Sequence, residues 1–244
     1  KGEFHEIYVV KSVVEEFQQV LTRTYKKAWT RDRTKHNPHY PTVPKGFQVV
    51  NVKRNENSHC WREYYCRRAE LQRREAEFQE EGKEGLEVYP DVKSMVAFRD
   101  IGGAKADRLI HEINEWYCFH GTNPDAAKSI CENDFKVSRS GTSTGSLYGR
   151  GLYFAESITK ADEYAKPNAS GHYAVLFCRV LGGRVKYVAE DEPNAEALVH
   201  DCIEGEYDSV LGDREKLRGT YREFVLFDSE DVYPEYIIEY VRLY

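Results

Sequence analysis

The second half of the chain places the strongest constraint on the fold, because it holds a succession of short apolar runs. The runs LYFAES, HYAVLFCRVL, YREFVLFD and EYIIEYVRLY follow one another between residues 152 and 244. Runs of this length that are rich in Val, Ile, Tyr and Phe are typical of strands. Few helical patterns lie between them, and this favours an α+β fold over a doubly wound parallel sheet.

The first half reads mainly as helix. Residues 6–29 carry apolar side chains at the i, i+3, i+4 and i+7 spacing of one buried face, which predicts a leading helix. A proline-marked loop follows, then a strand at 46–54 and a long, largely exposed helix at 56–82, with Trp61, Tyr65 and Leu71 turned inward. Shorter helices are expected at 104–113 and 123–133 and after Ser157 as N-cap, and residues 187–220 as mostly polar loop.

Composition limits the classes of partner. The chain has 244 residues, of which 41% are hydrophobic, enough for one sizeable core. Its formal net charge of −6 makes nucleic acid an unexpected partner, and no apolar run approaches the length that spans a membrane. The six cysteines form no C-x-x-C pair, so we expect free thiols in a reducing, intracellular compartment and no metal.

The chain begins without an initiator Met and without the apolar core of a signal peptide. We therefore expect it to be the C-terminal part of a longer protein. No composition shift splits it, so we expect residues 1–244 to form a single domain, with a leading helix and loop at 1–45 and the core at 46–244.

Four polar residues stand where predicted strands end or begin: His120, Tyr153, Tyr164 and Glu223. His120 follows the apolar run at 116–119 directly, and a helical pattern starts just after it. A lone histidine at such a place is usually structural or exposed, and both tyrosines could be core aromatics. Glu223 interrupts an apolar strand, so its carboxylate must be paired, exposed at an edge, or functional.

Other nucleotide or hydrolase motifs do not fit. Gly149 and Gly151 lack the third glycine of a dinucleotide-binding turn and lead into a strand rather than a helix. The chain contains no phosphate loop of the G-x-x-x-x-G-K-[ST] type and no G-x-S-x-G elbow.

The four residues together do form a known pattern. The order H-G-T, Y-G-R-G-L-Y-F-A, a helix ending E-Y-A, and R-E-F-V-L-F-D followed by Y-P-E-Y resembles the catalytic domain of the poly(ADP-ribose) polymerase family, the diphtheria-toxin-like ADP-ribosyltransferases. The resemblance extends over roughly residues 5–244. It implies an ADP-ribosyltransferase fold, a mainly antiparallel split sheet with flanking helices. The helical regulatory subdomain of the DNA-dependent members is not expected, because residues 1–45 are too short for it.

The resemblance also implies roles for residues. Glu223, His120 and Tyr153 would form the catalytic His-Tyr-Glu triad. The backbone of Gly121 would bind the nicotinamide carboxamide of NAD+, and Tyr153 and Tyr164 would stack on its ring. The full NAD-binding set would be His120, Gly121, Thr122, Tyr148, Gly149, Tyr153, Phe154, Ala155, Lys160, Ala161 and Tyr164.

One position departs from the family pattern. A serine that bonds the carboxamide is common three residues before the second stacking tyrosine, and Ala161 stands there in this chain. One hydrogen bond to the substrate is therefore expected to be absent, or to come from another group such as Thr159.

The implied function is transfer of ADP-ribose from NAD+ to protein side chains, with Glu and Asp as the expected acceptors and release of nicotinamide. The resemblance assigns NAD+ and acceptor proteins as partners, with no metal, no membrane and no DNA requirement. Members that lack the triad glutamate usually transfer a single unit, so Glu223 chemically permits chain growth. The alternatives are a strict mono-ADP-ribosyltransferase and a catalytically silent module that binds ADP-ribose or a protein partner.

Overall fold

A computed structural model describes residues 3–39, 41–101, 108–137 and 147–244. Its centre is a nine-stranded sheet in the order β1-β2-β9-β5-β3-β4-β8-β7-β6. Every neighbouring pair is antiparallel except β6 and β7, which confirms the α+β class and the mainly antiparallel sheet. The strands are β1 (Phe4–Tyr8), β2 (Gly46–Asn57), β3 (Glu115–Thr122), β4 (Leu152–Ala155), β5 (Tyr173–Leu181), β6 (Val185–Val188), β7 (Ser209–Asp213), β8 (Arg222–Leu226) and β9 (Val232–Leu243).

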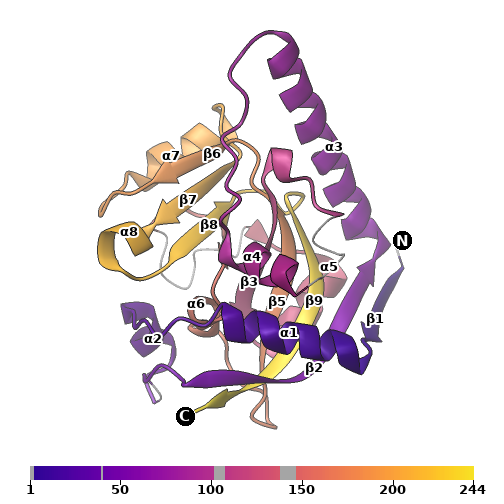
Figure 1. Cartoon of the computed structure of the whole chain (residues 1–244), viewed down its shortest axis with the longest axis vertical. Coiled ribbons are helices and arrows are strands. Elements are labelled where there is room, and N and C mark those ends of the chain that lie inside the picture. Colours follow the sequence, from indigo (N-terminus) through magenta and orange to yellow (C-terminus); the bar gives the residue numbers. More distant parts are fainter. Residues whose placement is uncertain (1–2, 40, 102–107, 138–146) are drawn as a thin grey trace.

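Helices cover both faces of the sheet, as Figure 1 shows. Phe17 of α1 and Phe98 of α4 both pack on the ring of Phe177 in β5. On the opposite face lies α5, which contacts β5 and β9. The α-helices are α1 (Lys11–Arg23), α2 (Arg31–His36), α3 (Ser58–Glu80), α4 (Lys93–Asp100), α5 (Pro124–Asn133), α6 (Ile158–Asp162), α7 (Ala195–Ile203) and α8 (Arg214–Arg218), with a 3₁₀ turn at His111–Ile113.

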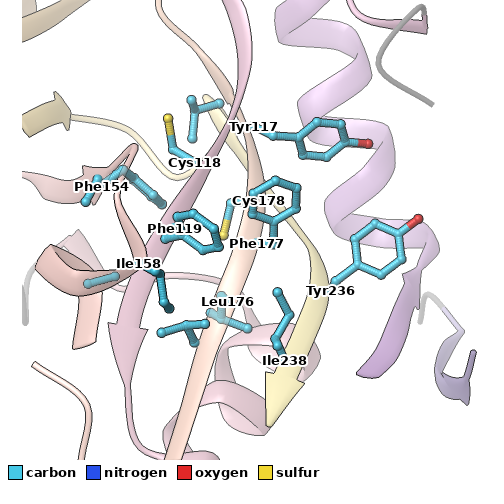
Figure 2. Close-up of a cluster of buried hydrophobic side chains, with 14 of the residues drawn as sticks. Tyr117, Cys118, Phe119, Phe154, Ile158, Leu176, Phe177, Cys178, Tyr236 and Ile238 are labelled. Carbon is cyan, nitrogen blue, oxygen red and sulfur yellow. The ribbon is translucent and has the colours of Figure 1, made fainter. Parts of the chain in front are cut away.

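The core lies around β3 and β5, whose side chains are buried on both faces. Tyr117 and Phe177 stack with ring centroids 4.9 Å apart, and Phe119 lies against the same phenylalanine (Figure 2). Cys118 and Cys178 fill the other side of the two strands and are fully buried. This two-sided burial explains why both strands read as continuous apolar runs without alternation.

The start of the chain differs from the prediction. Residues 4–8 form β1, an edge strand that pairs with the end of β2, and the helix begins only at Lys11. The buried face of α1 is Phe17, Val20 and Leu21. The helical spacing therefore held only for Lys11–Arg23. Extending the helix to residue 6 was wrong because β2 offers a free edge to the first residues, and extending it to residue 29 was wrong because residues 24–29 form no helix.

The segment at 187–220 was also predicted wrongly as loop. It contains the second half of β6 and all of α7, β7 and α8. Its strands are short, at four and five residues, and Asn194 and Asp213 cap the two helices with their side chains. Short elements in a polar segment leave little periodicity, so sequence pattern alone gives no signal for them.

The long charged helix is confirmed as α3, which projects from the body of the molecule (Figure 1). Leu71 faces inward as predicted, whereas Tyr65 is 52% exposed and Tyr64 takes the buried position instead. Of the helix expected at 104–113, residues 104–107 lie outside the described part of the chain, and none of the remaining residues is α-helical; His111–Ile113 form the 3₁₀ turn. No described helix is both long and apolar enough to cross a membrane.

Candidate active site

The candidate site lies where the sheet almost divides in two. Strands β3 and β4 share a single registered pair, Phe119 with Ala155. Just beyond this pair, the Nδ1 atom of His120 lies 3.0 Å from the backbone carbonyl oxygen of Tyr153. A carbonyl can only accept, so Nδ1 carries the proton in this hydrogen bond. The histidine side chain thus joins the two strands where the backbone ladder has ended.

A cavity of about 710 Å³ lies beside this junction. This volume is in the usual range for sites that hold a nucleotide-sized ligand. Ten of the twelve residues predicted from sequence line it: His120, Gly121, Thr122, Tyr153, Phe154, Ala155, Lys160, Ala161, Tyr164 and Glu223. Residues from three strands and one helix therefore meet around one space, although some of them are more than a hundred positions apart in the chain.

Tyr148 and Gly149 do not line this cavity. The Tyr148 ring is fully buried against Gly212 of β7, where a Cβ would lie 2.0 Å from the ring. Their backbone reaches the site indirectly, because the Tyr153 hydroxyl accepts from the Tyr148 N–H and donates to the Gly149 carbonyl. These two bonds hold the Tyr153 ring at the cavity wall.

Gly121 is required by the close approach of α6 to β3. A Cβ at this position would lie 1.8 Å from the backbone carbonyl oxygen of Ala161. Real Cβ atoms do not come so close, so any side chain here would push α6 away from the strand. The glycine therefore sets the distance between β3 and α6. This helix carries Lys160 and Ala161, and Tyr164 follows shortly after its C-terminal end.

Glu223 faces the cavity because side chains alternate along β8. Its neighbour Phe224 goes into the core against Trp116, and Glu223 points the other way with 13% of its side chain exposed. The carboxylate lies 3.5 Å from the ammonium of Lys160. The Glu223 carboxylate is therefore ion-paired, and it also lines the cavity.

Lys160 is the centre of the local electrostatics. Its ammonium lies 2.8 Å from Asp32, 3.0 Å from Glu163 and 3.5 Å from Glu223. Burial lowers the pKa of the Lys160 ammonium, but the three carboxylates together raise it well above its ordinary value of 10.5. Lys160 is therefore a permanent cation at the cavity wall.

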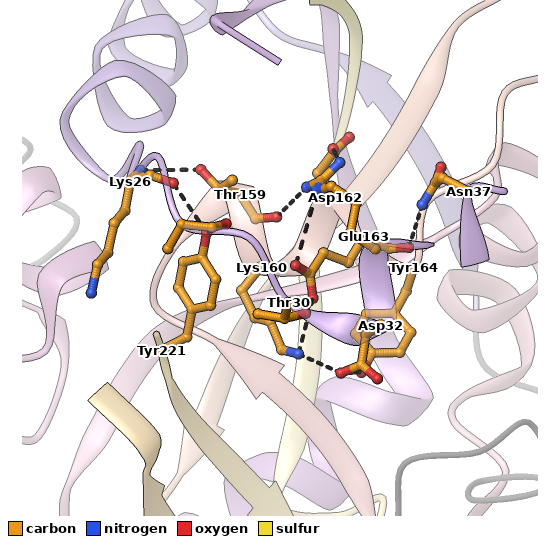
Figure 3. Close-up of polar contacts among 12 residues, drawn as sticks. Lys26, Thr30, Asp32, Asn37, Thr159, Lys160, Asp162, Glu163, Tyr164 and Tyr221 are labelled. Carbon is orange, nitrogen blue, oxygen red and sulfur yellow. Dashed lines mark hydrogen bonds and ion pairs between the residues drawn. The ribbon is translucent and has the colours of Figure 1, made fainter. Parts of the chain in front are cut away.

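A strap formed by residues 24–37 runs across α6 and fixes it in place (Figure 3). Its Arg33 is fully buried and donates to the carboxylate of Asp162 and to the Thr159 carbonyl, at 2.9 and 2.8 Å. Further bonds join Thr24 with Ser157, Lys26 with Thr159, Thr30 with Glu163, and Asn37 with Glu163. Ser157 is the N-cap residue of α6 but makes no capping bond; its hydroxyl donates to the strap instead.

Two strap residues contact side chains of the site, and sequence reasoning missed both; of the two, only His36 lines the cavity. Asp32 accepts from the Tyr164 hydroxyl at 2.9 Å as well as from Lys160. His36 lines the cavity, with its ring centroid 4.8 Å from that of Tyr164. Neither residue carries a local signal, because each meets α6 only through the fold. The cavity also includes residues that were not predicted on the α5 side: Asn123, Asp125, Ala126, Ser129, Ile130, Asp134, Phe135 and Lys136.

Thr159 does not replace the hydroxyl that Ala161 lacks. The Thr159 side chain is fully buried, and its hydroxyl accepts from the backbone N–H of Lys26 rather than facing the cavity. Ala161 itself lines the cavity. Among the residues that the structure describes, no cluster of three or more His, Cys, Asp or Glu side chains could hold a metal ion.

Comparison with known proteins gives one family. The sequence profile of the "Poly(ADP-ribose) polymerase catalytic domain" matches residues 22–242. Among relatives, protein mono-ADP-ribosyltransferase PARP12 of Mus musculus is 28% identical over 135 residues, which is 53% of this chain and 17% of that protein. Protein mono-ADP-ribosyltransferase PARP10 of Mus musculus is 42% identical over 71 residues, 28% of this chain and 7% of that protein.

A third relative has a different printed activity. Poly [ADP-ribose] polymerase tankyrase of Caenorhabditis elegans is 24% identical over 169 residues, which is 56% of this chain and 7% of that protein. The matched segments thus span 7% to 17% of the length of these three relatives.

Proposed function

This chain belongs to the poly(ADP-ribose) polymerase catalytic domain family, and on that basis we propose that it transfers ADP-ribose from NAD+ to protein side chains with release of nicotinamide. The observation that carries the proposal is the meeting of Glu223 with His120, Tyr153 and Tyr164 around one cavity. These residues come from separate elements, so their convergence is a property of the fold.

The chemistry follows from the charge that develops during the reaction. The bond between the ribose C1′ atom and the nicotinamide nitrogen breaks, and the electron pair leaves with nicotinamide. The ribose then carries positive charge until an acceptor oxygen bonds to C1′. A carboxylate beside this carbon stabilises the charge, and the stabilisation is largest where water is largely excluded. Glu223, with most of its side chain buried, is suited to this role.

His120 is suited to bind a substrate hydroxyl. Burial lowers the pKa of His120 below its ordinary value of 6.5, although the bond to the Tyr153 carbonyl opposes the shift. The neutral ring keeps its proton on Nδ1, where it donates to Tyr153. The Nε2 atom is then an acceptor, and it can bind the O–H group of a ribose.

We propose carboxylate side chains, Glu and Asp, as acceptors, since a carboxylate forms the new bond without releasing a proton. Glu223 would also orient the ribose hydroxyl of a unit already attached, which favours chain growth. Transfer of a single unit is the second candidate, supported by the names of the PARP10 and PARP12 relatives.

Incubation with NAD+ labelled in its ADP-ribose part separates these candidates. A ladder or smear of labelled protein on a gel supports chain growth, and one sharp labelled band supports single transfer. Absence of label on protein together with absence of released nicotinamide would contradict both and leave a binding module.

We also propose that the reaction needs no DNA. The formal net charge of −6 gives the chain no overall attraction for a polyanion. Nicked DNA titrated into the labelled NAD+ assay should leave the rate unchanged. A rise of several-fold would show that this domain contains a DNA-responsive element.

A further inference from the structure

Asp32 differs from the other strap residues in what it contacts. The strap residues Arg33, Thr30 and Asn37 bind buried groups of Asp162 and Glu163, two residues that do not line the cavity. Asp32 is 30% exposed, and its Oδ2 atom accepts from two cavity-lining side chains, Lys160 at 2.8 Å and Tyr164 at 2.9 Å. A role in stabilising α6 alone would not require these two partners.

Asp32 competes with Glu223 for the same ammonium. Lys160 has three N–H donors, and hydrogen bonds to Asp32 and Glu163 engage two of them. Glu223 is the most distant of the three carboxylates, at 3.5 Å. Removing the charge of Asp32 would free one N–H donor of Lys160. It would also remove the attraction that draws the ammonium toward Asp32 and away from Glu223. Lys160 would then move toward Glu223.

A close ion pair would weaken Glu223 for the proposed chemistry. Its oxygens would be engaged by the ammonium, and its negative charge would be neutralised beside the carbon where positive charge develops. With Arg33 and Arg242 on Asp162, the connected group formally holds three cations and four carboxylates: Arg33, Lys160 and Arg242, and Asp32, Asp162, Glu163 and Glu223. The group therefore has one formal negative charge in excess, and removing the charge of Asp32 would remove this excess.

We propose that Asp32 is a positioning residue for ADP-ribosyl transfer, which holds Lys160 back so that Glu223 remains an available carboxylate. This inference rests on the proposed function. It assigns a role in the reaction to the N-terminal strap, through contacts that Figure 3 shows from Asp32 to Lys160 and Tyr164.

The test measures nicotinamide release from NAD+ by Asp32→Asn, which keeps the shape and removes the charge. Loss of one electrostatic stabiliser costs on the order of 10²–10³ in kcat, and partial neutralisation of Glu223 should cost about tenfold or more, with KM changed less than about threefold. Asp32→Glu restores the charge and should recover kcat to within about threefold of the parent. Asp191→Asn is the matched control, since Asp191 pairs with Arg218 on the exposed surface.

A second background identifies the route of the effect. If Asp32 acts through Lys160, then Asp32→Asn should change kcat less than about twofold when Lys160→Gln is already present. If Lys160→Gln does not fold, the Glu223→Gln background provides the same test, because Asp32 cannot protect a charge that is absent. A full additional loss of kcat in the background that folds would overturn the inference.

Other outcomes are equally decisive. An Asp32→Asn protein that keeps the parental kcat would overturn the inference and leave the proposed function standing. A loss confined to KM would also overturn it, because it would assign Asp32 to substrate binding through Tyr164. A parent chain that releases no nicotinamide would remove the proposed function, and the inference with it.

Discussion

At the scale of single residues, position in the fold decides which polar groups can act. His120, Tyr153 and Glu223 come from three neighbouring strands of the sheet. His120 lies near the end of β3, where its ring binds the backbone carbonyl of Tyr153 in β4, and Glu223 faces the cavity because side chains alternate along β8. Their chemistry is then set by partial burial. The same side chains on an open surface would be solvated, and they would have little effect on a charge developing nearby.

The neutral state of His120 should be visible in the stability of the chain. Its pKa is lowered in the folded state, so the unfolded chain binds the proton more tightly. Neutral His120 thus makes its full contribution to the free energy of unfolding above the ordinary pKa of 6.5. This contribution is lost as the pH falls from there through the lower pKa that His120 has in the folded state. Urea unfolding of His120→Gln should show a shallower loss of stability below pH 6.5 than the parent. An identical pH dependence of the two proteins would contradict the assignment. Burial also lowers the pKa of His36, but His36 is present in both proteins and so does not contribute to the difference between them.

Ala161 offers a second test of residue placement. It lines the cavity, whereas the hydroxyl of Thr159 is engaged with Lys26. We expect Ala161→Ser to tighten the binding of a benzamide-type nicotinamide mimic by about 0.5–1.5 kcal/mol, or roughly 2- to 13-fold, as one added hydrogen bond would. Calorimetry on the two proteins measures this difference in affinity. Equal affinity of the parent and Ala161→Ser would mean that the helix does not aim position 161 at the carboxamide.

At the scale of elements, the strap at 24–37 and α6 depend on each other. The helix is five residues long and has no side-chain cap, so it has little stability of its own. Buried polar contacts to the strap take the place of a cap. They also fix the helix against Gly121, and so they set the position of Lys160 in the cavity.

Breaking this contact should therefore cost much of the stability. Arg33 and Asp162 are both fully buried, and removal of one partner of a buried ion pair typically costs about 3–5 kcal/mol. We expect Arg33→Ala to lower the free energy of unfolding in urea by this amount. The exposed Arg218, paired with Asp191, should lose at most about 1 kcal/mol on the same substitution. Similar losses for the two arginines would show that the strap is not a stabilising element.

The same elements show how far sequence reasoning reaches. His120, Gly121 and Glu223 were predictable because each lies within a short local motif. Asp32 and His36 were not, since they meet Tyr164 across more than 120 positions and no periodicity marks them. Tyr148 was predicted to bind NAD+, but its ring packs against Gly212 of β7, and only its backbone N–H contacts a residue of the site, the Tyr153 hydroxyl.

At the scale of the whole molecule, the nearly divided sheet produces the cavity. Strands β9, β5 and β3 form one continuous apolar block, β4, β8 and β7 form another, and one registered pair joins them. The sequence predicted the strands of both blocks from their apolar runs, except β7, and the strand order required the structure. Edge elements such as β1 and β6 escaped prediction because they are short and half exposed.

The central claim is that this cavity carries out ADP-ribosyl transfer with the Glu223 carboxylate. The most direct test compares the parent and Glu223→Gln for transfer from NAD+ labelled in its ADP-ribose part, with NAD+ affinity measured separately. The parent should label protein and release nicotinamide. Glu223→Gln should bind NAD+ within a few-fold of the parent and should transfer about 10²–10³-fold more slowly, because the substitution keeps the shape and removes the stabilising charge. Equal transfer by both proteins, or no transfer by the parent, would contradict the claim.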